Sequence, residues 1–197
     1  FEYPTIRELA ESLSNTEKKA SIHIPQIEAN DTYEVSHAQR RMWILSQFRE
    51  ANVAYNIYMV YEFGKLDLKA FSNAFSYLLN RHEALRTTFV RWDGELRQRI
   101  QSLEELNFRM EYEDLRGAES IEQEYGKLES EVSGHVFDLE NGPLVRACLV
   151  RVEDDLYKFL LNIHHIVVDG WSYEILGTEF LTIYDAFQLG KTPNLKA

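Results

Sequence analysis

The chain has 197 residues, of which 45% are hydrophobic and 13% aromatic, which is typical of a folded globular protein and far from the composition of a disordered one. Its 21 basic and 32 acidic residues give a formal net charge of −11, which argues against nucleic acid or a membrane surface as a partner. The single cysteine, Cys148, excludes a disulfide framework and a multi-thiolate metal site. We expect Cys148 to be buried, with a reactive thiol as the alternative. Neither a signal segment nor a bilayer-length apolar run is evident, so we expect a cytoplasmic protein.

The first 31 residues carry one short helical pattern followed by a polar stretch. Thr5 and Glu8 have the spacing of a helix capping box, so we expect a helix within residues 1–15. Residues 16–31 are polar and aperiodic, which is typical of a linker. Because the chain opens at Phe1 without an initiator Met, we expect it to be part of a longer protein. The apolar stripe of the expected helix consists of Ile6, Leu9, Ala10 and Leu13.

Residues 32–197 alternate between helical and strand patterns, and no internal repeat is evident. Asp93-Gly94 predicts a hairpin turn, and Ser172 is predicted to cap the last helix. This interleaving predicts a domain of the α/β or α+β class. The expected helices are 36–48, 67–81, 120–136 and 172–190, and the expected strands are 53–63, 86–92, 96–101, 108–112, 144–152 and 157–166.

The strand predicted at 157–166 carries His164 and His165 near its far end. Because successive strand side chains point to opposite faces, the two histidines cannot address one site, which argues against a metal centre. The pattern leaves open which histidine faces a cavity, and both could be ordinary core or turn residues. Asp169 could orient a histidine or hold the turn that follows. A junction from strand to turn to helix commonly presents side chains to a cleft, where an imidazole can act as base, acid or hydrogen-bond acceptor.

The run His-His-Ile-Val-Val-Asp-Gly at 164–170 resembles the His-His-x-x-x-Asp-Gly signature of condensation domains from nonribosomal peptide synthetases. Trp171 and Ser172 complete that motif. On these residues, and on three further segments that follow the family order, the chain is identified as a member of this family. The three segments are 36–43, with Met42 where Leu is usual, 81–89, and 137–146.

The resemblance implies an α/β fold, an α+β two-layer sandwich that corresponds to the N-terminal lobe of a chloramphenicol-acetyltransferase-like pseudodimer. Residues 32–197 would form this lobe. Residues 1–15 resemble the C-terminal helix of a peptidyl carrier protein, which residues 16–31 would link to the lobe. The later motifs of the family, and with them the second lobe, are missing. We therefore expect the chain to be inactive alone.

The resemblance also implies an amide-forming acyltransferase that transfers a donor acyl or peptidyl group from its thioester to an acceptor aminoacyl thioester. Both substrates would arrive on the 4′-phosphopantetheine arms of upstream and downstream carrier proteins, and the domain itself would bind no cofactor or metal. By family position His165 is the catalytic residue. Asp169 is expected to pair with Arg81 and to act structurally rather than to move protons. The supporting residues implied by the motifs are His164, Asp169, Gly170, Trp171 and Arg81.

Four alternatives share parts of this pattern. An epimerization domain has the same histidine motif, but Trp171-Ser172 and the segment 81–89 favour condensation. A heterocyclization domain would resemble a doubled-aspartate pattern in place of the two histidines. A standalone coenzyme A-dependent acyltransferase shares the fold, but the carrier-like residues 1–15 argue against it. A non-catalytic docking lobe is the alternative from a different class of protein.

Overall fold

The computed structural model describes residues 4–14 and 27–195 and divides the chain into two compact units, Phe1–Asn30 and Asp31–Ala197. In the first unit, α1 spans Ile6–Ser14. The Glu8 N–H donates to Thr5 Oγ1 at 3.3 Å and the Thr5 N–H donates to Glu8 Oε2 at 3.0 Å, so the predicted capping box is confirmed. Most of the predicted linker lies outside the described residues.

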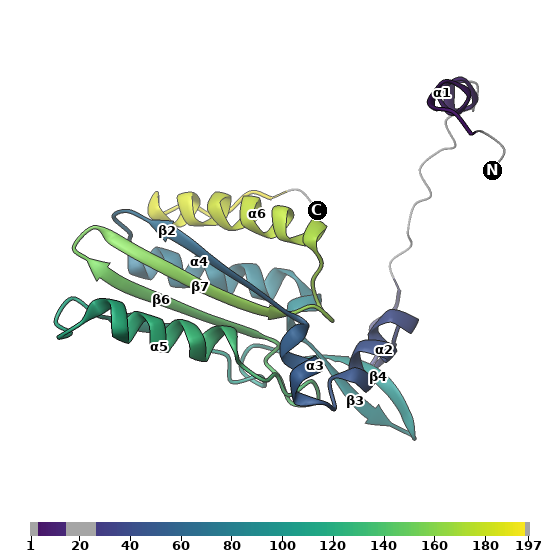
Figure 1. Ribbon diagram of the computed structural model, residues 1–197, viewed down its shortest axis with the longest axis horizontal. Coiled ribbons are helices and arrows are strands. Elements are labelled where there is room, and N and C mark those ends of the chain that lie inside the picture. The colour runs from purple at the N-terminus through teal and green to yellow at the C-terminus, as the bar shows by residue number, and fades with distance from the viewer. Residues whose placement is uncertain (1–3, 15–26, 196–197) are drawn as a thin grey trace. The chain divides into compact units, whose positions relative to one another are not determined.

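A four-stranded sheet forms the centre of the second unit (Figure 1). Its order is β2-β7-β6-β5; β7 is antiparallel to β2 and β6, and β5 is parallel to β6. The strand predicted at 108–112 is therefore displaced toward the C-terminus, because its pairing with β6 begins only at Glu111. The strands are β2 (Asn56–Phe63), β5 (Glu111–Asp114), β6 (Val145–Glu153) and β7 (Leu156–His164).

Two helices, α4 (Leu68–Arg81) and α6 (Gly170–Gln188), cover one face of this sheet (Figure 1). Helix α4 begins at an Asp67 cap and buries its apolar residues at three- and four-residue intervals, as the pattern predicts. Phe71 is fully buried where these layers meet, and its ring contacts rings from β2, β7 and α6. The predicted α/β class, with helices layered on a sheet, is confirmed.

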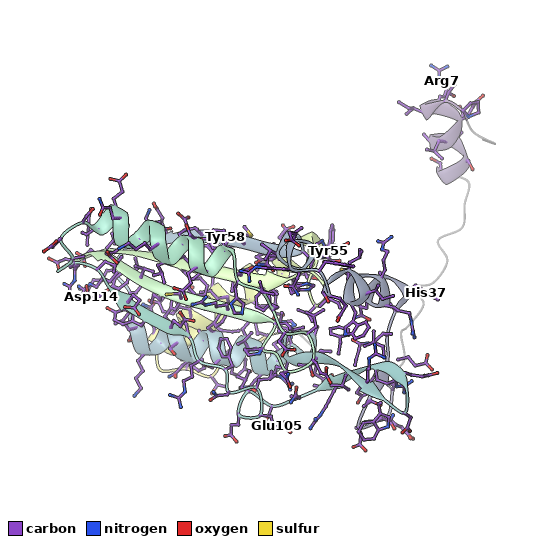
Figure 2. All side chains as sticks on the ribbon, turned by 60° about the horizontal axis from the view of Figure 1, so that its bottom comes forward. Arg7, His37, Tyr55, Tyr58, Glu105 and Asp114 are labelled. Carbon is purple, nitrogen blue, oxygen red and sulfur yellow. The ribbon has the colours of Figure 1, made fainter. Side chains whose placement is uncertain are left out.

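Helix α5 (Ile121–Ser133) covers the opposite face of the sheet (Figure 1). It packs through Val132 and its partly buried apolar residues against Cys148 and Leu160. Cys148 is fully buried, as predicted, and this burial raises the pKa of its thiol to about 12, which argues against a reactive thiolate. Tyr58, labelled in Figure 2, reaches across from β2, and its hydroxyl lies 3.2 Å from Glu129 Oε1.

A smaller antiparallel sheet of order β1-β4-β3 lies beside the first sheet. Asp93 and Gly94 connect β3 to β4 with φ values of 50° and 82°, so the predicted hairpin turn is confirmed. The smaller sheet shares a core cluster that includes Phe89, Phe137 and Ile166. The remaining elements of this region are β1 (Tyr33–Glu34), α2 (His37–Leu45), η1 (Glu83–Arg86), β3 (Thr87–Trp92) and β4 (Glu95–Ile100).

The helix predicted at 36–48 ends at Leu45, and the strand predicted at 53–63 begins only at Asn56. Between them lies α3 (Arg49–Ala54), which the sequence reading did not predict. Asn52 explains the difference, because its buried amide both donates to and accepts from the Phe137 backbone, at 2.9 and 3.0 Å. This long-range contact has no signal in the local periodicity.

No helix in the described part of the chain combines the length and hydrophobicity needed to cross a bilayer.

Candidate functional site

The strand β7 sorts its side chains onto two faces of the sheet. Phe159, Leu161 and Ile163 face α4 and α6, whereas Leu160 faces α5. Alternation places Asn162 and His164 on the α5 face and returns His165 to the α4/α6 face. His164 is 0% exposed and His165 is exposed, so the two histidines lie in different environments, as the alternation predicts.

His164 is enclosed and held in one tautomer. Its Nδ1 accepts a hydrogen bond from the Ile166 N–H at 3.2 Å, so the ring proton is on Nε2. The rings of Tyr55 and Phe137 lie beside it, each with a centroid separation of 6.1 Å. Burial, with a smaller contribution from His165, lowers the pKa of His164 to about 4. A neutral, buried imidazole of this kind cannot exchange protons with a substrate at the surface.

His165 is the solvent-exposed histidine of the pair. Its backbone N–H donates to Tyr55 O at 2.8 Å, which extends the pairing with β2 by one residue beyond β7. This hydrogen bond fixes the backbone from which the exposed imidazole projects. The side chain therefore combines access to solvent with a rigid attachment, as a catalytic base or a substrate-positioning group requires.

Asp169 is the N-cap of α6. Its Oδ1 accepts hydrogen bonds from the Ser172 N–H at 2.8 Å and from the Ser172 hydroxyl at 2.6 Å. These bonds lower the pKa of Asp169, and His165 contributes a smaller effect. The prediction that Ser172 caps this helix is wrong: the helix begins at Gly170, and Ser172 supplies the donors that the Asp169 cap requires. The Asp169 carboxylate therefore holds the turn into α6. This is the structural one of the two roles that the sequence left open, the other being to orient a histidine.

The predicted ion pair between Asp169 and Arg81 is wrong. The Arg81 guanidinium binds Glu179 of α6 instead, with Nε 3.0 Å from Oε2, and His82 Nε2 lies 2.7 Å from the same oxygen. The reason is the course of α6, which brings Glu179, more than two turns after its N-terminus, beside the end of α4. Arg81 therefore joins two helices rather than supporting the motif turn.

Arg86 closes the C-terminal end of α4. Its guanidinium donates to the carbonyl oxygens of Leu79, Asn80 and Gln101 at 3.1, 3.0 and 2.6 Å. This arrangement satisfies carbonyls that a helix end leaves unpaired and ties them to the chain just after β4. These contacts give Arg86 a structural role.

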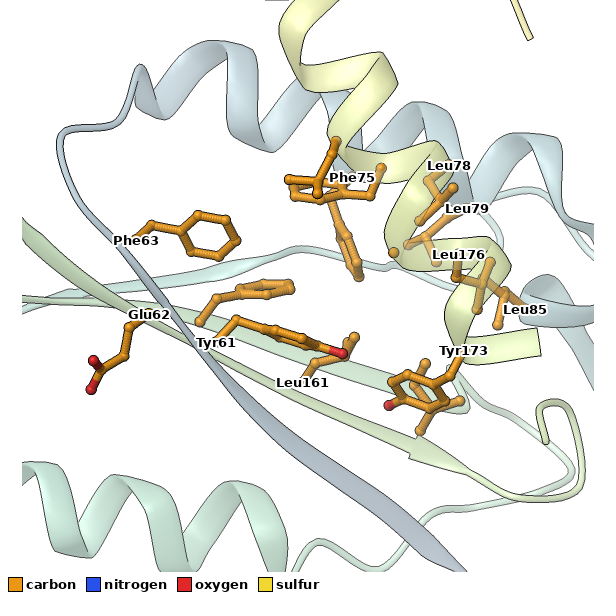
Figure 3. A pocket seen from close by; sticks show the side chains of 15 residues that line it. Tyr61, Glu62, Phe63, Phe75, Leu78, Leu79, Leu85, Leu161, Tyr173 and Leu176 are labelled. Atoms are coloured by element: carbon orange, nitrogen blue, oxygen red, sulfur yellow. The ribbon is translucent and has the colours of Figure 1, made fainter. Parts of the chain in front are cut away.

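The structure also contains an apolar cavity of about 210 Å³ between α6, α4 and the edge strand β2 (Figure 3). The cavity lies on the α4/α6 face of the sheet, which is also the face of His165, but His165 is not among the residues that line it. The Tyr173 hydroxyl donates to Ile57 O at 3.3 Å, and burial raises the pKa of Tyr173. The sequence did not predict this cavity. Hydrophobic periodicity indicates which side chains face the core, but not where those side chains leave a space between them.

Gly170 and Trp171 form the first residues of α6, in the same junction as His165 and Asp169. Trp171 is 79% exposed and Ile175, one turn later, is 46% exposed. An indole left in solvent is a common feature of surfaces that contact another molecule or domain. Within the described residues, no group of three or more His, Cys, Asp or Glu side chains is placed to hold a metal ion.

The family model of the condensation domain matches residues 29–197. Tyrocidine synthase 3 of Brevibacillus parabrevis is 40% identical over 190 residues, which cover 96% of this chain and 3% of that protein. Gramicidin S synthase 2 of Aneurinibacillus migulanus is 40% identical over 192 residues, or 97% of this chain and 4% of that protein. The chain thus spans a small part of these relatives.

Solved structures agree in fold. The starter condensation domain of rhizomide synthetase aligns with a TM-score of 0.77 at 24% identity, over 85% of this chain and 40% of that chain. The first condensation domain of the calcium-dependent antibiotic synthetase, solved with a substrate analogue, aligns with a TM-score of 0.74 at 21% identity. This second alignment covers 84% of this chain and 40% of that chain.

Proposed function

Because the chain belongs to the condensation-domain family of nonribosomal peptide synthetases, we propose that it forms peptide bonds between two carrier-bound thioesters. The donor is an acyl or peptidyl thioester and the acceptor is an aminoacyl thioester, each held on the 4′-phosphopantetheine arm of a carrier protein. The observation that carries the proposal is the exposed His165, on a fixed strand end beside a capped helix, in a chain of this family.

The proposed reaction moves one proton, in net terms, from the amine nitrogen to the departing sulfur and requires no redox step. The acceptor amine attacks the donor thioester carbonyl, a C–N bond forms and the C–S bond breaks. The donor arm takes up the proton that the amine has lost and leaves as a thiol. A free α-amino group has a pKa of about 7.7–8.0, so a useful fraction is already neutral near neutral pH. His165 Nδ1 or Nε2 would accept the amine proton as the bond forms, which is worth roughly 10²–10⁴-fold in rate. Holding the two thioesters together would contribute through proximity.

His164, Asp169 and Arg81 take supporting roles in this proposal. His164 is buried and neutral, and Asp169 is engaged by Ser172, so neither is free to accept the amine proton. Arg81 lies against Glu179 and holds α4 to α6. Gly170 and Trp171 complete the turn into α6. This division leaves His165 as the catalytic residue of the motif.

We further propose that a second lobe completes the cleft in the whole enzyme and that the chain alone is inactive. The chain covers 40% of the rhizomide synthetase domain that it resembles, and α6 leaves Trp171 and Ile175 exposed. Residues 1–15 would be the last helix of a carrier protein, with residues 16–31 as the linker to the lobe. In support, Ile6 and Leu9 of α1 are 90% and 47% exposed and would need the rest of a carrier domain to bury them.

The test is His165→Ala in the two-lobed enzyme with loaded donor and acceptor carriers. Intact-protein mass spectrometry of the acceptor carrier should show loss of the dipeptidyl product, while thermal melting stays unchanged. His37→Ala, at an exposed position outside the junction, is the matched control. Turnover near that of the unaltered enzyme in the His165→Ala variant would contradict the catalytic role of His165, and absence of product from the unaltered two-lobed enzyme would favour a non-catalytic docking lobe.

A further inference from the structure

Three buried polar atoms at neighbouring positions of β2 and β7 lack a hydrogen-bond partner. Among the described residues, the buried side-chain atoms that lack a hydrogen-bond partner are Asn56 Oδ1, Asn162 Oδ1 and His164 Nε2. Such atoms are paired in the great majority of folded proteins, because burying a polar atom without a partner destabilises the folded state. Three of them in adjacent positions therefore call for a shared partner.

The strand register brings the three side chains together. Asn56 of β2 is opposite His164 of β7, and Asn162 precedes His164 by two residues on the same face. The His165 N–H donates to Tyr55 O on the β2 side, whereas the His164 N–H donates to Leu144 O on the β6 side. The pair of Asn56 and His164 is then of the non-hydrogen-bonded kind, in which opposite side chains approach most closely.

Both asparagines are oriented by the C-terminal end of α5. Asn56 Nδ2 donates to Ser133 O at 3.1 Å and to His135 O at 2.8 Å. Asn162 Nδ2 donates to Val132 O at 2.6 Å and to Ser133 O at 3.3 Å. Because the two amides share Ser133 O, they are neighbours. Rotating either amide would place its oxygen against a carbonyl, so each Oδ1 is the free acceptor.

His164 supplies the complementary donor. Its Nδ1 accepts from the Ile166 N–H, which leaves the proton on Nε2. The site is therefore lined by two free acceptors and one free donor. A cation would meet the Nε2–H and an anion would meet two amide oxygens, so the set matches neither. A water molecule matches it, since water donates two hydrogen bonds and accepts up to two.

We propose that Asn56 Oδ1, Asn162 Oδ1 and His164 Nε2 bind one internal water molecule. The water donates to the two amide oxygens and accepts from the imidazole. It links β2 to β7 near the strand end that presents His165, through asparagines that also bind carbonyls at the end of α5. His164 is then a positioning residue that acts through this site and not on a substrate. The inference does not depend on the proposed peptide-bond formation.

A high-resolution crystal structure of the full chain tests the site directly. The expected result is a water within about 2.7–3.2 Å of the three atoms. Direct hydrogen bonds among the three side chains, or an ion in the same place, would overturn the proposal. His164→Phe removes the donor and should lose the water, whereas His165→Phe, at the neighbouring exposed position, should retain it. Retention of the water in both variants would also overturn it.

A second measurement keeps the test decisive if His164→Phe fails to fold. In ¹⁵N-labelled unaltered protein near pH 7, the His164 Nε2–H should give a slowly exchanging cross-peak with cross-relaxation to a long-lived water. Exchange with bulk solvent as fast as that of an exposed imidazole would refute the site. Cross-relaxation to protein protons alone would refute it equally.

Discussion

On the α4/α6 side of the sheet, Phe71 lies fully buried among four rings with centroid separations of 4.8 to 5.7 Å. On the α5 side, the end of the same sheet holds the amides of Asn56 and Asn162 and the imidazole of His164. One strand, β7, supplies both kinds of surface through alternate residues. Its apolar residues pack without directional constraint, and its polar residues form directional bonds.

The two faces of the sheet therefore contribute to the fold in different ways. Apolar burial on the α4/α6 face stabilises the domain but tolerates small shifts of its packing partners. The asparagines on the α5 face bind particular carbonyls between Val132 and His135, and Asn52 binds Phe137. These bonds fix the path of residues 132–137, which lead toward β6, the strand that pairs with β7. The following substitutions separate the two contributions, from the largest expected effect to the smallest.

Phe71→Ala tests the apolar face. The substitution removes a fully buried ring with four aromatic neighbours, and we expect the free energy of unfolding to fall by about 3–5 kcal/mol. Urea denaturation measures the loss. Phe48→Ala, at a position that is 64% exposed, is the matched control and should change stability little. Equal effects of the two substitutions would show that the ring cluster does not dominate stability.

The pH dependence of stability tests the buried imidazole on the other face. Burial lowers the pKa of His164 from 6.5 to about 4, so between these values the unfolded chain binds a proton that the folded chain refuses. The contribution of neutral His164 to the free energy of unfolding is fully present above about pH 6.5. It is lost as the pH falls toward 4, by about 3 kcal/mol in total. An NMR titration should find His164 neutral down to about pH 5. Protonation of His164 near pH 6.5 would contradict its enclosure.

Asn162→Ala tests the amide contacts with α5. The variant removes the Asn162 donor from the carbonyls of Val132 and Ser133, of which Ser133 O keeps the Asn56 amide, and we expect the free energy of unfolding to fall by about 1–3 kcal/mol. Hydrogen exchange should accelerate at the C-terminal end of α5 and much less in α4. Asn73→Ala, at an exposed position of α4, is the control. Uniform acceleration across both helices would argue against a local anchoring role.

Asp169→Ala tests the junction where the two faces meet, and we expect the smallest effect. The variant loses the α6 cap and should lower the melting temperature slightly, whereas Asp169→Asn should retain it, because Asn caps helices as well as Asp. The hydrogen bonds from Ser172 lower the pKa of Asp169, so the cap contributes above the ordinary carboxyl pKa and is lost as the pH falls through the lowered value. Damage from Asp169→Asn equal to that from Asp169→Ala would indicate that charge, not capping, matters.

Local signals in the sequence predicted a large part of this fold. The Thr5–Glu8 box, the Asp93-Gly94 turn and the period of α4 each depend on residues a few positions apart, and all three are confirmed. The separation of His164 from His165 also follows from strand alternation alone. The sequence could not show that Asp169 rather than Ser172 caps α6, because both residue types are good caps and the two positions are only three residues apart.

Contacts between residues that are distant in the chain could not be predicted from the sequence. Arg81 was expected to pair with Asp169, yet Glu179 is its partner, because the choice among acidic residues depends on how α6 crosses α4. No periodic signal in the sequence indicates the bonds from Asn52, Asn56 and Asn162 to residues 132–137. None indicates the cavity beside Tyr173. Each arises between residues that are distant in the chain.

By itself, the sequence determined the family, the α/β class and the histidine motif, because these depend on residue types at fixed spacings. Only the tertiary structure decided which face each histidine meets and which groups surround it. It buries His164 beside the rings of Tyr55 and Phe137, opposite Asn56 in the strand register, and it leaves His165 exposed at the strand end. The physical reason is that burial and hydrogen-bond partners are properties of the packed layers, which local periodicity does not specify.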